Sequence, residues 1–547
     1  MYHYIYRLGK IVLAVLAASG AIALASEVLW TRTLETLVGN STYAFSMILV
    51  VYQVGIAFGS WLMSLFVGRI KKAPFWLVAL QVGMGFWTLI AIFLIDLIRS
   101  NIFSESIIAI SVYAYLWNCL KAMCILFPLA LLSGASFPLA TRIIEPGSKD
   151  AQGSLIARAY AWNTIGAVFG SLLAGFIIAP FMDFFQSLYF LAFLYGLIAL
   201  FAYFFINQGD FQAQLKKPAS LGLCGLLVLL ICVGAYQISG ESHFVKRFQA
   251  RFPYRQVVFH KPGLQGITTV AKQRTRPLAN RLLVNGMGMT VKITDTKMMA
   301  HLPMLTHPNP ENTLVICFGM GTTFRSAISH NGKVTAVELI KEVYEAFPFF
   351  FDDANRVKAY PQGKLITNDG RIFLKLTQDR FDVITIDPPP PIDAAGVTNL
   401  YSKDFLELAR SRLKDGGIMA HWIPLPGSLA GVDDSYSFRM LLATFKEVYP
   451  FSYIMPAWNN VGVHVLGSIK PIEFSKEKIK GKLEITSVAQ DIFEWEVIPL
   501  DYFDKIVPLE LPGYQGLIVT DDHPFLEFNL LRYLRRGTRK SSPLTAW

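Results

Sequence analysis

Charged residues are scarce in this 547-residue sequence: they make up 16% of it, whereas soluble domains carry about 25%. Hydrophobic residues make up 53% and aromatic residues 13%. This composition excludes a purely soluble, disordered or fibrous protein, so a large membrane portion is required. The formal net charge of +11 fits basic loops that anchor a membrane protein better than a surface that binds nucleic acid.

Cysteine is also rare, and its spacing is not typical of a metal site. The five cysteines lie in apolar or strand-like runs without a CxxC pair: Cys119, Cys124, Cys224, Cys232 and Cys317. We interpret them as buried thiols, so neither a disulfide framework nor a bound metal is expected. The acidic segment TDDH at 520–523 is interpreted as a turn in which Asp side chains cap backbone groups.

Long uncharged runs fill the first 240 residues and predict about seven membrane-spanning helices, because one span needs about 20 apolar residues. The runs are 11–26, 43–68, 73–95, 122–141, 159–182, 184–209 and 218–240. A further stretch at 106–120 lengthens the fourth span or forms an interfacial helix, and an eighth span there would be cramped. The pairs Gly55–Gly59 and Gly166–Gly170 predict close helix packing. The sequence thus predicts a polytopic α-helical domain over 1–240 in the cell (inner) membrane, with the lipid bilayer as a partner.

Lysine and arginine gather on alternate loops of this domain. The side of the N-terminus holds Arg7, Lys10, Arg69, Lys71, Lys72, Arg142, Lys149, Arg158, Lys216 and Lys217. The other side holds Arg32 and Arg99. Because such residues concentrate on the cytoplasmic side, the N-terminus is predicted to be cytoplasmic. Seven spans would then place the second half of the chain outside and eight would place it inside, so its side stays open.

The second half has the composition of a soluble α/β protein. Short runs at 256–260, 266–272 and 281–286 predict strands, separated by turns at Pro262-Gly263 and Asn285-Gly286, and hence a small β segment over 241–305. From residue 313 onward, β-branched strands alternate with helical runs. That order predicts a parallel, doubly wound, Rossmann-like domain over 306–547.

Ligands bind beyond the carboxyl ends of the strands in such a domain, and glycines and acids are found there. Gly319 and Gly321 follow the first strand, where a tight turn lets the backbone approach a ligand. Glu338 ends the second strand, where an acidic residue commonly accepts hydrogen bonds from ribose hydroxyls. Asp369 and Asp387 follow the third and fourth strands. A single acid there is often a helix cap, but the combination predicts a nucleoside-type ligand.

A dinucleotide is disfavoured, because Thr322, Thr323 and Phe324 follow Gly321 in place of a complete GxGxxG phosphate loop. A sulfonium nucleoside carries no phosphate and needs no such loop. Acids around it would complement its positive charge.

Several segments carry a resemblance to a known family. AHLPMLTHPNPENTLVICFGMGTTFRSA, VTAVELI, NDGRIFL, FDVITIDPPPP and LYSKDFLELARSRLKDGGI resemble the spermidine synthase (polyamine aminopropyltransferase) family, and SGAIALASEVLWTR and NTIGAVFGSLLAG are similar to its membrane-fused branch. The family transfers an aminopropyl group from decarboxylated S-adenosylmethionine to an amine. The resemblance therefore implies this nucleoside, or S-adenosylmethionine itself, as donor substrate, and a small amine as acceptor.

The resemblance also implies roles for individual residues. The donor-binding residues would be Gly319 and Gly321 in the nucleoside turn, Glu338 at the ribose, Asp369 at the adenine amino group and Gln265 near the substrate. Asp387 matches the catalytic aspartate. A carboxylate at the reacting centre can take the proton that an ammonium nucleophile must lose before it attacks, and such a group contributes typically 10²–10⁴-fold.

The sequence also departs from the family pattern. Met320 and Pro390 stand where soluble members have aspartates, and Asp295, Thr296 and Lys297 replace a tyrosine–glutamine–glutamate motif that helps to bind the acceptor. Fewer acids and an added lysine should repel a dicationic acceptor. The prediction is a membrane-bound aminopropyltransferase-like enzyme; a different acceptor or a methyl-type transfer stays open. The alternative is a catalytically degenerate membrane assembly or transport component that retains the nucleoside-binding fold. An oligomer or a membrane-complex partner stays open for both.

The basic C-terminal tail over 532–540 is short and close to a membrane. Attraction to anionic lipid explains it more simply than nucleic-acid binding does.

Overall fold

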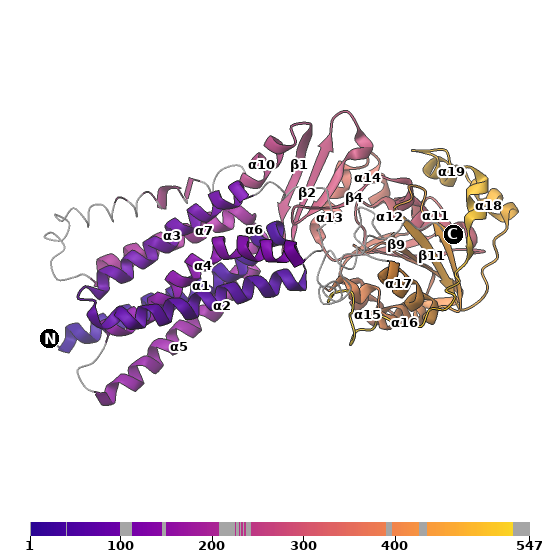
Figure 1. Cartoon of the computed structure of the whole chain (residues 1–547). Helices are drawn as coiled ribbons and strands as arrows, with labels where there is room; N and C mark the ends of the chain where they lie inside the picture. The colour runs from indigo at the N-terminus through magenta and orange to yellow at the C-terminus, as the bar shows by residue number, and fades with distance from the viewer. Residues whose placement is uncertain are drawn as a thin grey trace. The chain divides into compact units, whose positions relative to one another are not determined.

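The computed structural model of the chain describes residues 2–39, 41–98, 112–144, 149–206, 242–389, 396–425 and 435–528, with single positions between 225 and 236. These residues form two compact units, one mainly of residues up to Phe252 and one mainly of residues from Pro253 onward. Figure 1 shows long helices in the first unit and a mixture of strands and helices in the second.

Within the described residues of the first unit, six helices are long and apolar enough to cross a membrane. Their apolar spans are Gly9–Val38, Thr42–Arg69, Ala73–Ile95, Leu116–Ile143, Gly153–Phe181 and Phe184–Phe205. They correspond to the first six predicted runs, so a polytopic helical domain is confirmed. The seventh predicted run, 218–240, lies almost entirely outside the described residues. Of the stretch 106–120, the described part belongs to one continuous helix, Val112–Ile143, and so lengthens the fourth span.

The helix bounds of this unit are α1 (Tyr2–Val38), α2 (Thr42–Phe66), α3 (Ala73–Ile98), α4 (Val112–Ile143), α5 (Lys149–Leu173), α6 (Ala179–Phe181), α7 (Phe184–Ile206) and α10 (His243–Arg251), with a 3-10 turn η1 (Val67–Arg69) and a π-helical turn η2 (Ala174–Ile178). Helix α1 packs against α5 and α7, and α3 packs against α7. The predicted glycine pairs lie at close helix contacts. A Cβ on Gly166 would overlap the backbone of α1, and one on Gly59 would overlap the backbone of α4.

The second unit begins with a four-stranded antiparallel sheet in the order β1-β2-β3-β4. Its strands are β1 (Arg255–Pro262), β2 (Ile267–Gln273), β3 (Arg281–Val284) and β4 (Met287–Val291). Asn285 and Gly286 join β3 to β4 with φ values of 52° and 78°, the left-handed conformation that a two-residue hairpin turn requires. The small β segment is therefore confirmed. The buried helix α11 (Thr294–Thr306) follows it.

An eight-stranded sheet forms the centre of the second unit, in the order β12-β10-β11-β9-β8-β5-β6-β7. Its strands are β5 (Asn312–Ile316), β6 (Lys333–Glu338), β7 (Gly363–Thr367), β8 (Phe381–Ile386), β9 (Leu413–Pro424), β10 (Phe451–Pro456), β11 (Gly462–Ser468) and β12 (Val507–Pro508). The five strands from β7 to β9 are parallel, as predicted. The three beyond β9 are antiparallel, which the strand–helix alternation did not predict.

Helices cover both faces of this sheet, so it is doubly wound. One apolar core joins it to α15 (Gly370–Leu376), α16 (Lys403–Ser411) and α17 (Ser435–Val448). The other joins it to α11, α12 (Thr322–Ile328), α13 (Lys341–Ala346) and α14 (Ala354–Lys358). The remaining elements are α18 (Lys476–Leu483), α19 (Thr486–Ile492) and the 3-10 turns η3 (Pro277–Ala279), η4 (Phe347–Phe349), η5 (Val397–Leu400) and η6 (Leu500–Lys505).

Candidate active site at the strand ends

The strand order reverses between β5 and β8, because β6 and β7 lie on one side of β5 and β8 and β9 on the other. Crevices at such a switch point are where ligands bind in open α/β sheets. Ile316 at the end of β5 pairs with Val337 in β6 and with Ile386 in β8. The residues that follow, Glu338 and Asp387, therefore flank the end of β5 on its two sides.

The turn after β5 has a strained, open backbone. Cys317, Gly319 and Gly321 all have positive φ, at 68°, 54° and 84°. A Cβ on Gly321 would overlap the ring of Phe347, so this glycine is required for packing. At Gly319 the nearest atom to an added Cβ is Cγ2 of Thr290 at 3.7 Å. The backbone at Gly319 therefore has open space beside it, as a nucleoside turn requires.

The carboxylate of Glu338 is held by this turn. Its Oε2 accepts hydrogen bonds from the N–H groups of Phe318 at 2.9 Å and Gly319 at 3.4 Å, and its Oε1 accepts one from Ile340 at 3.1 Å. Burial raises the pKa of Glu338, and these backbone N–H groups oppose the rise. A carboxylate offers about four acceptor sites, so the fixed oxygens can still accept from ribose hydroxyls.

Asp369 has a structural role that the sequence had already suggested as the simpler interpretation. It is the N-cap of α15, and its Oδ1 accepts a hydrogen bond from Ile372 N at 2.8 Å. Its own N–H donates to Asn368 Oδ1 at 2.8 Å. Capping fixes one carboxylate oxygen at the strand end and leaves the other available for a donor such as an adenine amino group.

Asp387 follows β8 and is half-buried. Burial raises the pKa of Asp387 to about 6; the nearby His464 lowers it and the nearby Asp295 raises it. A carboxyl group with a pKa near 6 is suited to accept a proton at neutral pH.

All three predicted acids act electrostatically on the thiol of Cys317. Burial raises the pKa of Cys317, and the charges of Glu338, Asp387 and Asp369 raise it further. Glu338 and Asp387 directly follow the residues that pair with Ile316 at the end of β5, and Thr367, which pairs with Glu338, lies two residues before Asp369. The structure thus brings these acids and the glycine turn together at the carboxyl edge of the sheet.

Gln265 is exposed in the turn between β1 and β2, and among the described residues no hydrogen bond or ion pair joins it to the other predicted site residues. The turn itself is ordered by Gly263 N, which donates to Gly266 O at 2.9 Å, and by Ile267 N, which donates to Asn285 Oδ1 at 2.9 Å.

Asp295, in the first turn of α11, was not among the predicted site residues. This side chain is 1% exposed, and its carboxylate accepts hydrogen bonds from Trp458 N at 2.5 Å and from Asn459 N and Nδ2 at 3.1 Å. Burial acts to raise the pKa of Asp295, but His464 and these backbone groups outweigh it and lower the pKa. Asp295 therefore stays anionic, and its charge raises the pKa of Asp387.

Lys297 does not supply the repulsion expected from the sequence. Its ammonium lies 2.6 Å from Glu494 Oε2 and 3.8 Å from Asp491 Oδ1, and it stacks on the Trp495 ring with 4.1 Å to the centroid. Because two carboxylates compensate its charge, Lys297 adds no net repulsion, and the argument against a dicationic acceptor rests on the missing acids alone. The pairing could not be read from the sequence, since about 200 residues separate the partners.

Tyr401 and His421 border the same edge. Tyr401 donates a hydrogen bond from its hydroxyl to Pro389 O at 3.2 Å, two residues after Asp387. His421 contacts the Tyr401 ring at 4.7 Å between centroids, and burial lowers the pKa of His421 to about 4. It is therefore uncharged at neutral pH and borders the site as an aromatic wall. Pro390 lies outside the described residues.

The TDDH segment forms a turn, in which His523 N donates to Thr520 O at 3.2 Å. Among the described residues, the partners of the Asp521 carboxylate are side chains and not the backbone groups expected for a cap: Asp521 pairs with Arg371 and accepts a hydrogen bond from Ser402 Oγ at 2.7 Å. Across the described ranges, no group of three or more His, Cys, Asp or Glu side chains is placed to hold a metal ion.

Known proteins are similar to this region. Residues 293–429 match the family model described as spermine/spermidine synthase domain. The polyamine aminopropyltransferase of Methanocaldococcus jannaschii is 31% identical over 193 residues, which is 34% of this chain and 65% of that protein. The polyamine aminopropyltransferase of Bacillus cereus is 28% identical over 220 residues, which is 37% of this chain and 76% of that protein. The C-terminal part of the chain contains a spermine/spermidine synthase domain.

The matched part of this spermine/spermidine synthase domain includes Asp295, Glu338, Asp369 and Asp387, whereas Gln265 lies before it. The six apolar helices also lie outside it. Among solved structures, the spermidine synthase from Thermotoga maritima is 21% identical, with a TM-score of 0.36 over 41% of this chain and 77% of that chain. A spermidine synthase in complex with the transition state analogue AdoDATO is 18% identical, with a TM-score of 0.34 over 44% of this chain and 87% of that chain.

Proposed function

We propose that the spermine/spermidine synthase domain is a membrane-bound aminopropyltransferase-like enzyme. It would transfer a group from decarboxylated S-adenosylmethionine, or a related sulfonium nucleoside, to a small amine. The observation that carries the proposal is the position of Glu338, Asp369 and Asp387 at the ends of β6, β7 and β8, on either side of the turn after β5.

The donor would bind through its nucleoside. Its ribose hydroxyls would donate to Glu338, which the backbone N–H groups of Phe318 and Gly319 hold in place. Its adenine amino group would donate to the free oxygen of Asp369. Gly319 supports this placement, because the space beside its backbone admits a ligand. Gln265 would act near the substrate, on the family resemblance alone.

The transfer step needs a base at the amine. An ammonium has no lone pair, so its proton would pass to the carboxylate of Asp387. The free amine nitrogen would then attack the donor carbon attached to the sulfonium sulfur. As the new N–C bond forms, the C–S bond breaks and its electron pair returns to sulfur, which leaves a neutral thioether nucleoside. Asp295, also anionic, would attract the positive charge of the acceptor.

One experiment tests this proposal directly. Calorimetry of the full chain in detergent should show binding of decarboxylated S-adenosylmethionine, S-adenosylmethionine or methylthioadenosine, and Asp387→Asn should abolish turnover while it preserves that binding. Absence of binding by all three nucleosides would refute the proposal.

The second candidate is a membrane assembly or transport component with a degenerate site. Met320 favours it: this side chain replaces a family aspartate and is 2% exposed within the apolar core beside α12, so it cannot hold a donor amine. Nucleoside binding without turnover, for every amine tried, would support this candidate over the enzyme.

A further inference from the structure

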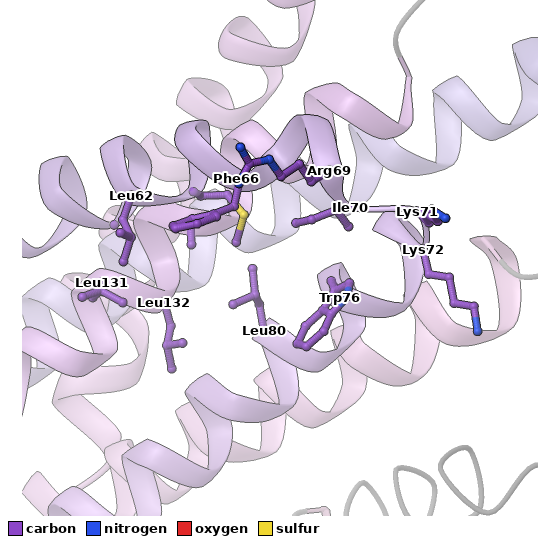
Figure 2. Close-up of a pocket in the computed structure, with 13 residues that line it drawn as sticks. Leu62, Phe66, Arg69, Ile70, Lys71, Lys72, Trp76, Leu80, Leu131 and Leu132 are labelled. Carbon is purple, nitrogen blue, oxygen red and sulfur yellow. The ribbon is translucent and has the colours of Figure 1, made fainter.

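A cavity of about 650 Å³ opens in the helical unit where α2 ends and α3 begins. Most of its lining is apolar and comes from three helices, with Leu62 and Phe66 on α2, Trp76 and Leu80 on α3, and Leu131 and Leu132 on α4. Figure 2 shows the leucines of α4 at one end of the cavity and a basic group, Arg69, Lys71 and Lys72, at the other.

The charged residues that line the cavity are all basic. No acidic residue lines it, and within the part of the chain that the structure describes, Arg69, Lys71 and Lys72 form no ion pair. All three side chains are exposed. A cationic amine would be repelled here, whereas a phosphate group would be attracted by three positive charges.

The length of the cavity matches one leaflet of a bilayer. From Gly59 to Arg69 the chain rises about 15 Å at 1.5 Å per residue, half of the ~30 Å hydrocarbon thickness. The inner end is closed by tight helix packing: a Cβ on Gly59 would overlap the backbone of Leu131, and Ser60 Oγ donates to Gly134 O at 2.7 Å. At the outer end Trp76 is 51% exposed, as an aromatic side chain at a membrane interface commonly is.

We propose that this cavity binds one anionic phospholipid of the surrounding bilayer. Its acyl chain lies against the apolar walls formed by Leu80, Leu131 and Leu132. Its phosphate contacts the basic group at the rim. An apolar groove closed at mid-membrane depth and a cationic rim at the surface fit an amphiphile with an anionic head, and neither feature fits a soluble polyamine.

The test compares phosphatidylglycerol with phosphatidylcholine of identical acyl chains, bound to the full chain in detergent and measured by native mass spectrometry. We expect the apparent Kd for phosphatidylglycerol to be at least tenfold lower, because each basic residue near an anionic lipid contributes roughly fivefold. Equal affinities for the two lipids would overturn the proposal without any variant.

Two variants separate the head-group and acyl-chain contributions. The triple variant Arg69→Gln, Lys71→Gln, Lys72→Gln should reduce the preference to within twofold, while Arg158→Gln, Lys246→Gln, Arg251→Gln, which removes the same charge elsewhere on the unit, should preserve it. Leu132→Trp should fill the cavity and weaken the binding of both lipids at least fivefold. Its control is Leu172→Trp, at a position that is 49% exposed on α5, and this variant should have no effect.

The result that would contradict the proposal is unchanged phosphatidylglycerol binding in both the triple variant and Leu132→Trp. Complete displacement of the lipid by millimolar inorganic phosphate would equally overturn it, because the site would then recognise a soluble anion. Both outcomes are independent of the transferase proposal, since the cavity lies wholly within the helical unit.

Discussion

The Nε2 atom of His464 lies 3.5 Å from Oδ1 of Asp295, and both side chains are buried. This nitrogen has no hydrogen-bond partner among the described residues. Both groups also act on Asp387, in opposite directions. Asp295, His464 and Asp387 therefore interact electrostatically as one group, on the proposed acceptor side of the site.

Asp295→Asn should weaken an amine acceptor and shift the pH profile of turnover. Loss of the anion should raise KM for a diamine about tenfold, while donor affinity stays unchanged. Because Asp295 raises the pKa of Asp387, its neutralisation should move the acidic limb of kcat to lower pH. A pH–rate profile distinguishes this effect from simple loosening of the 458–459 loop, which would lower kcat without moving the limb.

Asp387→Asn should reduce turnover at least about 10²-fold and stabilise the fold at neutral pH. Burial raises the pKa of Asp387 from its usual 3.8 to about 6, so the folded chain binds this proton more tightly than the unfolded chain. Stability therefore falls as pH rises from about 4 to about 6, by at most about 3 kcal/mol. Thermal unfolding at pH 7.5 should show a higher Tm for the variant and no difference at pH 4; a lower Tm at both values would contradict this.

Glu338→Gln should weaken nucleoside binding about 10–100-fold. An amide at this position would bring an NH₂ group toward the N–H groups of Phe318, Gly319 or Ile340, so at least one backbone donor would lose its acceptor. The control is Glu345→Gln on α13, whose carboxylate forms an ion pair with the exposed Lys261 away from the nucleoside turn. Calorimetric Kd values that are equal for the two variants would argue against Glu338 as the ribose ligand.

The sequence predicted best what depends on short-range pattern. Hydrophobic runs located six spans, and alternating strands and helices located the parallel half of the sheet. Glu338, Asp369 and Asp387 could be assigned to one edge, because the carboxyl ends of parallel strands must meet there. Strand β11 pairs antiparallel with both β9 and β10. It follows β10 through the short connection 457–461, whereas β10 follows the helix α17, and the alternation of strands and helices does not show that β11 inserts between β9 and β10.

Contacts between distant residues could not be predicted in this way. The sequence shows Lys297 as an added charge, and only folding reveals that α19 and the residues after it supply Asp491 and Glu494 to compensate it. His464 likewise reaches Asp295 from a strand nearly 170 residues away. A single sequence carries no signal for such pairs, since neither partner belongs to a local motif.

Asp491→Asn should destabilise the second unit by about 1–3 kcal/mol, because it removes one of the anions shared by Lys297 and Arg325, which keep Glu494, and weakens the acceptor for buried hydrogen-bond donors. Asp491 Oδ2 accepts from His301 Nε2 at 2.9 Å and Ser326 Oγ at 2.6 Å, and Oδ1 lies 2.6 Å from Arg325 Nη1. Burial acts to raise the pKa of Asp491, but these partners outweigh it and hold the pKa well below its usual range.

The effect of Asp491 on the pH dependence of stability is opposite in direction to that of Asp387. The unfolded chain binds this proton more readily, so the stabilisation is complete above about pH 5 and is lost as pH falls through 3.8 and below. The matched control is Asp415→Asn, whose surface partner Lys470 is 57% exposed and which should cost less than about 1 kcal/mol. Urea unfolding at pH 7 measures the free energy of unfolding of both variants. Similar decreases in the two variants would show that the Asp491 cluster contributes no more than a surface pair.

The side of the membrane on which the domain lies decides between the two candidate functions. Six spans return the chain to the side of the N-terminus, and a seventh, over 218–240, would carry it across. A transferase that uses a nucleoside made in the cytoplasm must face inward.

A cysteine in place of Glu473, whose side chain is 76% exposed, reports on which side of the membrane the domain lies. For the enzyme we expect Glu473→Cys in intact cells to resist a membrane-impermeant maleimide until lysis, with the parent chain as the background for its native thiols. Labelling before lysis would place the domain outside, away from its donor, and would leave the assembly or transport role as the better explanation.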